Sequence, residues 1–248
     1  MAQRGFQDRQ GEHWTLINGS SANRRLAIFV HGFLGNHLTT WGRLPELLQL
    51  NADADPVLAA WDFLFIGYST PDVVTYLDIA RLISTQLDLA CEGRPPFANK
   101  YERFALLGHS LGTLGIRQLL CAKALHHPEM LANLHSVLLF GTPLNGSRLA
   151  MFGGLFGGAI AKALEPRNPQ LRMLHAWTES VYPSMNWRRV KLVLGTDDQV
   201  VGFDHGDLIK FAGDEPNHIL WNFDHRSMVK PTSWETSTIR DLIVGALT

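Results

Sequence analysis

The clearest pattern in this chain is a series of short apolar runs without polar alternation. Runs of this kind, bounded by glycine or polar turns, are typical of strands that are buried on both faces of a parallel sheet. The predicted strands are 26–30, 61–66, 104–107, 137–140, 191–194 and, near the carboxyl terminus, 219–223.

Several segments between these runs have apolar residues at the spacing of a helix. Apolar residues recur three or four positions apart over 73–90, and Gly93 followed by two prolines ends that pattern. A second helix is predicted over 111–125. Residues 232–235 have the spacing of a capping box and predict a last helix that runs from there to about residue 246.

Alternating strands and helices predict an α/β fold, with a doubly wound, mostly parallel sheet and helices on both faces. The 248 residues fit a single domain of this kind, and the sequence shows no internal repeat. In such a sheet, ligands bind beyond the carboxyl ends of the strands. Residues that carry chemistry are therefore expected directly after the strands.

The segment 144–189 is too long for a plain crossover between two strands, and we expect it to form an inserted helical cap or lid. It holds the apolar stretch 150–164, in which Phe152 and Phe156 are candidate substrate contacts of an acyl-chain pocket. That stretch is too short to span a bilayer but would permit peripheral contact with a membrane. The alternatives are an ordinary crossover helix with decorated loops and, for 150–164, a helix packed in the core.

Composition argues against a nucleic-acid partner and against a metal site. Lys and Arg number 22 against 23 Asp and Glu, with no run of like charge, so the basic footprint of a nucleic-acid-binding protein is missing. Two cysteines without C-x-x-C spacing and scattered histidines without H-E-x-x-H predict no metal site, and no cofactor is predicted. The polar amino terminus lacks an apolar signal segment, which predicts a cytoplasmic protein.

A G-x-S-x-G motif at 108–112 follows the predicted strand 104–107 and opens the next predicted helix. In that context the glycines allow a sharp turn, and Ser110 is held in a strained conformation with its hydroxyl exposed at the end of the sheet. Ser110 is therefore the candidate nucleophile; the alternative is a glycine-rich helix start with a capping serine. A serine hydroxyl needs a neighbouring base that is itself oriented by a carboxylate.

The acid and the base should follow this serine in the order aspartate, histidine. Asp197 and Asp198 come directly after a predicted strand, and because adjacent side chains diverge, only one of them can meet the base. His225 lies just beyond the last predicted strand, whereas His205 follows the acid too closely and His218 precedes that strand. His225 is therefore the candidate base, and the residues alone leave both aspartates open.

The tetrahedral intermediate of acyl transfer needs two N–H donors for its oxyanion. Residues 31–36 (HGFLGN) follow the first predicted buried strand, and Gly32 would let the backbone turn its amides toward the serine. The candidate donors are the N–H groups of Phe33 and of Leu111, the residue after the nucleophile. His31 is expected to brace the loop by hydrogen bonding. Candidate substrate contacts here are Gly32, Leu34 and His109.

In combination these motifs resemble the α/β-hydrolase superfamily, in particular its lipase and esterase branch. The G-T-P-x-x-G-S segment at 141–147 and the D-H-x-x-M-x-K-P segment at 224–231 are most similar to the serine-active-site-containing and GPI-inositol-deacylase-like groups, whose members handle acylated lipids. The resemblance covers about residues 26–240. It selects Asp198, because in this family the acid commonly stands three residues after the glycine that ends its strand.

The leading hypothesis is a cofactor-free serine hydrolase that cleaves carboxylic esters of an acylated small molecule or lipid. Ser110, His225 and Asp198 would form its triad, and an acyl-enzyme would be the intermediate. The alternatives are an acyltransferase that passes the same acyl group to an acceptor other than water and a non-catalytic binding protein of this fold. An amide substrate stays open as well, because the same machinery cleaves both bonds.

Overall fold

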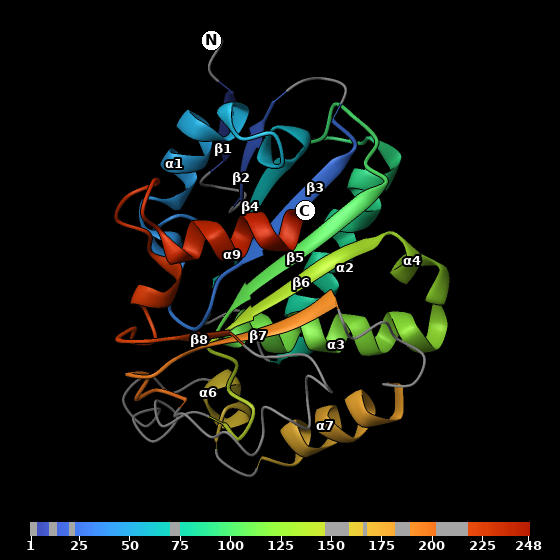
Figure 1. The fold of residues 1–248 in the computed structure, drawn as a ribbon. Coiled ribbons are helices and arrows are strands. Elements are labelled where there is room, and N and C mark those ends of the chain that lie inside the picture. The colour runs from blue at the N-terminus through green and yellow to red at the C-terminus, as the bar shows by residue number, and fades with distance from the viewer. Residues whose placement is uncertain are drawn as a thin grey trace.

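The computed structural model describes residues 4–9, 14–19, 23–69, 75–146, 159–165, 168–181, 189–201 and 218–248. Within these ranges the chain forms an eight-stranded sheet that is covered by helices (Figure 1). The strands are β1 (Gly5–Arg9), β2 (Trp14–Asn18), β3 (Arg25–Val30), β4 (Asp62–Ile66), β5 (Arg103–His109), β6 (Leu134–Phe140), β7 (Val190–Gly195) and β8 (His218–Leu220). Their spatial order is β1-β2-β4-β3-β5-β6-β7-β8. The pairs β1–β2 and β2–β4 are antiparallel, and the others are parallel.

Helices pack on both faces of this sheet. One face carries α2 (Tyr76–Glu92) and α3 (Leu111–His126), and the other carries α1 (Leu44–Asn51) and α9 (Thr238–Leu247). Shorter elements are α4 (Pro128–Ala132), α6 (Ala159–Ala163), η2 (Thr39–Trp41), η3 (Ala52–Ala54), η4 (Leu58–Ala60) and η9 (Ser227–Val229); α7 (Pro169–Val181) precedes β7. A membrane span would need a longer apolar stretch than any helix in the described ranges contains.

Burial on both faces explains the uninterrupted apolar runs of the sequence. In β3, Leu26, Ile28 and Val30 pack with the α2 and α3 side chains, whereas Ala27 and Phe29 pack with those of α1 and α9. Successive side chains of a strand point to opposite faces, so most positions of a strand covered on both sides are apolar. The predicted doubly wound, mostly parallel sheet is confirmed.

Capping explains the bounds of α2. The Thr75 hydroxyl accepts a hydrogen bond from the N–H of Leu77, and the Asp78 carboxylate accepts one from the N–H of Thr75. The helix ends at Gly93, whose φ of 67° lies in the left-handed region that favours glycine, as the sequence predicted. The first predicted turn, at Val73, lies outside the described residues.

The predicted start of the last helix at 232–235 is wrong. The helix α9 begins at Thr238, and its cap is Ser237, whose hydroxyl accepts a hydrogen bond from the N–H of Arg240 at 3.2 Å. The spacing of a capping box recurs by chance in a polar segment, and only the oxygen that reaches a free N–H at the helix start sets the boundary.

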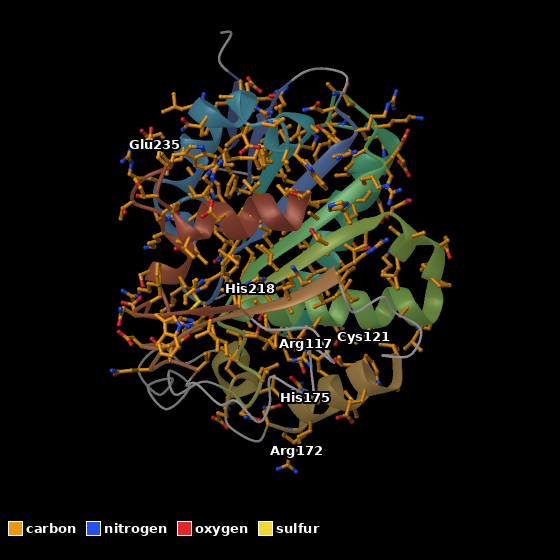
Figure 2. All side chains as sticks on the ribbon, viewed as in Figure 1. Arg117, Cys121, Arg172, His175, His218 and Glu235 are labelled. Carbon is orange, nitrogen blue, oxygen red and sulfur yellow. The ribbon has the colours of Figure 1, made fainter. Side chains whose placement is uncertain are left out.

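The predicted insertion 144–189 contains α6 and α7. Side chains of both elements join the apolar cluster of α2 and α3, among them Ile160, Ala163, Leu171, Leu174 and Val181, and so does Leu164, which follows α6. Figure 2 shows α7 beside α3, where the buried Arg117 donates to the Thr178 hydroxyl at 3.1 Å and lies 3.3 Å from Nδ1 of His175. The helix α7 is therefore packed as a crossover helix between β6 and β7. Phe152 and Phe156 lie outside the described residues, so the lid and acyl pocket stay predictions.

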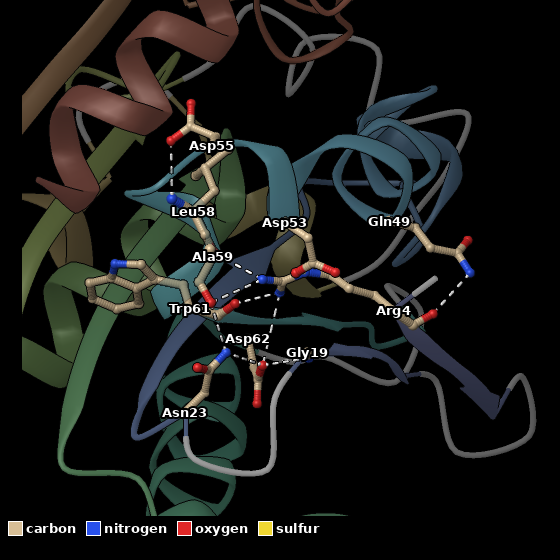
Figure 3. Close-up of polar contacts among 10 residues, drawn as sticks. All are labelled: Arg4, Gly19, Asn23, Gln49, Asp53, Asp55, Leu58, Ala59, Trp61 and Asp62. Atoms are coloured by element: carbon tan, nitrogen blue, oxygen red, sulfur yellow. Dashed lines mark hydrogen bonds and ion pairs between the residues drawn. The ribbon is translucent and has the colours of Figure 1, made fainter. Parts of the chain in front are cut away.

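A buried arginine ties the amino-terminal hairpin to the start of β4 (Figure 3). The Arg4 guanidinium donates to the Asp53 carboxylate at 2.7 Å and to the Trp61 carbonyl at 2.6 Å, and it lies 3.9 Å from the Asp62 carboxylate. Asp62, also fully buried, accepts a hydrogen bond from the Tyr101 hydroxyl at 2.7 Å. These buried charges are compensated at the amino ends of the strands, away from the ends where ligands bind.

Replacing Arg4 should destabilise the fold. We expect Arg4→Ala to lower the free energy of unfolding by about 3 kcal/mol, because it leaves buried carbonyls and a buried carboxylate without their cationic partner. Urea denaturation followed by circular dichroism measures this loss. The matched control is Arg43→Ala, which removes an exposed ion pair with Glu46 and should leave the midpoint nearly unchanged. Equal effects of the two substitutions would contradict a stabilising role for the Arg4 network.

Candidate active site

Ser110 stands between β5 and α3 in a backbone conformation that serine rarely adopts. Its φ is 53° and its ψ is −122°. Such a conformation costs on the order of 1 to 3 kcal/mol and persists only where the surroundings enforce it. Here the Ser110 N–H donates to the Phe140 carbonyl at 2.9 Å, and the Ser110 carbonyl accepts from the N–H of Thr113 at 3.0 Å. The strained turn predicted from the G-x-S-x-G motif is present.

Two glycines let the loop after β3 lie directly against this turn. A Cβ on Gly112 would lie 2.5 Å from the carbonyl oxygens of Val30 and His31, and a Cβ on Gly32 would lie 2.7 Å from the Cβ of Ser110. Neither separation is compatible with a real side chain. Gly32 was predicted to contact the substrate and to let the backbone turn its amides toward the serine. In the structure it lines the cavity, and its lack of a side chain permits this close approach.

The structure brings His225 and Asp198 together. Nδ1 of His225 lies 2.7 Å from Oδ2 of Asp198, and both side chains are buried. The other carboxylate oxygen of Asp198 accepts hydrogen bonds from the N–H groups of Val200 at 2.9 Å and Val201 at 3.1 Å. Asp197 is exposed, and its carboxylate accepts from the Thr196 hydroxyl instead. Of the twin aspartates, Asp198 is therefore the one that meets the histidine.

His109, predicted as a substrate contact, also braces His225. Its Nε2 lies 2.7 Å from the His225 carbonyl oxygen, to which it donates, and the two ring centroids are 4.8 Å apart. Burial, together with the neighbouring His225, lowers the pKa of His109 to about 3. His109 is therefore a neutral hydrogen-bond donor. It joins the turn that carries the serine to the loop that carries the histidine.

Ser110 and His225 face a common cavity of about 460 Å³. The described residues around it come from the loops after β3, β5, β7 and β8, which meet at the carboxyl ends of the parallel strands, where ligands bind in this architecture. The lining residues are Gly32, Phe33, Leu34, Gly35, Thr39, Thr40, His109, Ser110, Val200, His225, Arg226 and Lys230.

One candidate oxyanion donor, Phe33, lines the same cavity as Ser110, and the other, Leu111, directly follows the serine. Phe33 lies within the turn Gly32–Gly35, which the Gly35 N–H closes by donating to the Gly32 carbonyl at 3.2 Å. Leu34, the next residue of that turn, has a φ of 54°, a costly value for a residue with a side chain. Leu111 is the first residue of α3, and the first N–H groups of a helix have no partner within the helix.

His31 and His218 take structural places. His31 is fully buried; its Nε2 accepts from the N–H of Tyr68 at 3.0 Å, and its Nδ1 donates to the Gly32 carbonyl at 2.8 Å. The prediction that His31 braces the loop is confirmed. His218 is the first residue of β8, where burial and the nearby Lys191 lower its pKa. His205 lies outside the described residues.

Sequence reasoning missed several cavity residues. The hydrogen bond from His109 to the His225 carbonyl joins positions 116 residues apart, and no local sequence pattern indicates it. Arg226 and Lys230 also line the cavity. For these two the signal was available, since both belong to the D-H-x-x-M-x-K-P segment that supplies the base. Within the described ranges, no cluster of three or more His, Cys, Asp or Glu could hold a metal ion.

Comparison with known proteins supports the same fold. A search with the sequence matched no protein-family model and no curated protein. Among solved structures, phospholipase PlaB from Legionella pneumophila superposes with a TM-score of 0.64 over 92% of this chain at 18% identity. The match covers 60% of the PlaB chain, so the present chain spans about three fifths of that protein.

Two further neighbours match over nearly their whole lengths. The mature lipase BlEst2 from Bacillus licheniformis has a TM-score of 0.60 at 15% identity, covering 96% of this chain and 98% of its own. The monoacylglycerol lipase from Paleococcus ferrophilus has a TM-score of 0.56 at 16% identity, covering 94% and 97%. These neighbours and the sheet topology show that the chain has the α/β-hydrolase fold.

Substitutions of the two aspartates test which of them orients His225. We expect Asp198→Asn to lower kcat for p-nitrophenyl butyrate by about 10⁴-fold, as an amide in place of the orienting carboxylate does in a Ser-His-Asp triad. Asp197→Asn is the matched control and should change kcat little, because this side chain is exposed and, among the described residues, accepts from the hydroxyl of its neighbour Thr196. The reverse ranking would assign the acid to Asp197.

Proposed function

We propose that this protein is a serine hydrolase that cleaves carboxylic esters. The observation that carries the proposal is the shared cavity: Ser110 and His225 both line it, and His225 is hydrogen-bonded to the buried Asp198. A nucleophile, a base and an orienting carboxylate from three different loops are the set that acyl transfer requires.

In the proposed reaction, Oγ of Ser110 attacks the acyl carbon while Nε2 of His225 takes the hydroxyl proton. The N–H groups of Phe33 and Leu111 donate to the oxyanion of the tetrahedral intermediate. When that intermediate collapses, the bond to the alcohol oxygen breaks and His225 returns the proton to the leaving alcohol. Water then attacks the acyl-enzyme by the same steps, which releases the carboxylic acid and restores Ser110.

Asp198 supports the proposed proton transfer in two ways. Its carboxylate accepts from Nδ1 of His225, which leaves Nε2 with the lone pair that a base needs. The same carboxylate stabilises the imidazolium that forms during attack. Its second oxygen is held by two backbone N–H groups, so the carboxylate is fixed in place before the charge develops.

Structural neighbours give independent support for an ester substrate. Two of them are described as lipases and another as a phospholipase. The cavity of about 460 Å³ at the carboxyl ends of the strands suits a substrate with an acyl chain. We propose that the apolar segment 150–164 contributes the acyl-chain pocket through Phe152 and Phe156. Its described residues that pack in the apolar cluster of α2 and α3 are Ile160, Ala163 and Leu164.

The role of the nucleophile is tested by Ser110→Ala. Hydrolysis of p-nitrophenyl esters should fall by about 10⁶-fold in kcat, and covalent labelling by a fluorophosphonate probe should disappear. The circular dichroism spectrum and the urea midpoint of the variant establish that the fold is intact. A variant that retains more than a few per cent of the wild-type rate would place the nucleophile elsewhere.

The acyl pocket is tested by chain length. In the wild type, kcat/KM for p-nitrophenyl esters should rise with each added methylene until the pocket is full, since each buried methylene contributes about 0.8 kcal/mol. The double variant Phe152→Ser, Phe156→Ser should flatten this dependence. An equal loss on every chain length, or loss of folding, would make 150–164 a structural segment and move acyl recognition to other loops.

A further inference from the structure

Two cations line the cavity that holds the candidate nucleophile. Arg226 directly follows the base His225, and Lys230 lies at the end of the same short segment. Arg226 is exposed and Lys230 is half-buried. The chain as a whole has a formal net charge of −1, so this concentration of positive charge is a local property of the cavity.

The element η9 explains why both cations reach the same space. Met228 and Val229 are almost fully buried and join the apolar cluster beneath the sheet, which anchors the segment from one side. The N–H of Lys230 donates to the Ser227 carbonyl at 3.0 Å and closes the turn. Arg226 and Lys230, which flank the anchored residues, are left on the cavity side.

The stem of Lys230 lies on a glycine. A Cβ on Gly42 would stand 3.2 Å from Cγ and 3.3 Å from Cβ of Lys230, and Gly42 has a φ of 58°, which favours glycine. The methylenes of Lys230 thus pass closely over the backbone after η2, next to Thr39 and Thr40 of the cavity wall. This contact places the lysine stem against the loop that forms one wall of the cavity.

The carboxylates of Asp198 and Asp224 stand close in sequence to the cavity residues, and both accept hydrogen bonds from groups beside them. None of the described residues that line the cavity is acidic. Asp198 accepts from His225 and two backbone N–H groups. Asp224 accepts from the N–H groups of Arg226 at 2.8 Å and Ser227 at 2.7 Å, so its carboxylate caps its own turn. The Ser227 N–H lowers the pKa of the exposed Asp224 carboxylate, and Arg226 is close enough to help lower it. Both cations still face a cavity whose described lining residues include no acid.

We infer that Arg226 and Lys230 bind an anionic group of the ester substrate, and that this group is a phosphate monoester. The inference rests on the proposed function and narrows its substrate class. A phosphate monoester carries close to two negative charges at neutral pH, which matches two cations. Arginine offers a planar fork of donors and lysine a point charge, both common in phosphate recognition. A cleft lined by charges of one sign raises encounter rates with opposite charge by 10- to 1,000-fold.

A pair of esters with the same acyl chain tests this inference. The substrates are 1-octanoylglycerol 3-phosphate and 1-octanoylglycerol, both used below their critical micelle concentrations, and the readout is the ratio of their kcat/KM values. The wild type should favour the phosphate ester. In the double variant Arg226→Gln, Lys230→Gln, the ratio should fall by about 10-fold or more, and the wild-type preference should shrink at 1 M salt, where the Debye length is about 3 Å.

The matched control is Arg24→Gln, Lys100→Gln. It removes the same charge from exposed positions that precede β3 and β5, at the opposite end of the sheet, and the ratio should keep its wild-type value. A ratio that changes equally in both double variants would make the effect one of net charge and overturn the inference. Urea denaturation of both variants verifies that each is folded.

The outcomes separate this inference from the proposed function. If the wild type hydrolyses both esters in a manner that requires Ser110, yet shows no preference for the phosphate ester, the hydrolase stands and the anionic subsite is wrong. A phosphate preference that survives in the cavity variant also overturns the subsite. Hydrolysis of neither ester, with no fluorophosphonate labelling, overturns the proposed function and this inference with it.

Discussion

The site depends on one backbone contact, between the first turn of α3 and the loop that leaves β3. In the parallel pairing of β3 with β5, Val30 stands opposite Gly108, so the loops that follow these two strands leave the sheet at the same level. Gly112 and Gly32 then let the two loops touch without an intervening side chain. Because atoms this close cannot slide past each other, the position of Ser110 relative to Phe33 is fixed by the fold itself rather than by flexible side chains.

Parts of the fold with a local cause could be predicted from the sequence, and parts with a distant cause could not. The run 26–30 could be predicted as a strand buried on both faces, because it is short, is not interrupted by a polar residue and is followed by a glycine-containing turn. The start of α9 was misplaced, because several polar residues could cap a helix and only tertiary packing decides that Ser237 does. The role of Arg4 has no local signal either, since its partners Asp53 and Trp61 come from a segment far along the chain.

The candidate site also has residues that the local sequence indicates and residues that only the folded structure identifies. Ser110 and His225 could be proposed because each directly follows a recognisable strand, and the topology collects such positions at one edge of the sheet. The residues alone left Asp197 and Asp198 equivalent, and only their resemblance to a known spacing favoured Asp198. The structure supplies the physical difference: the turn after β7 directs one carboxylate inward to His225 and leaves the other in solvent.

Two histidines lie side by side at the centre of this site, and their surroundings make them different. The ring of His225 has a carboxylate 2.7 Å from its Nδ1, so a positive charge on it is compensated. The ring of His109, 4.8 Å away, meets a backbone carbonyl in a buried setting, and its pKa falls to about 3. When His225 takes the serine proton in the proposed reaction, it therefore faces a neutral neighbour. A second imidazolium at that distance would oppose the proton transfer, and burial of His109 prevents it.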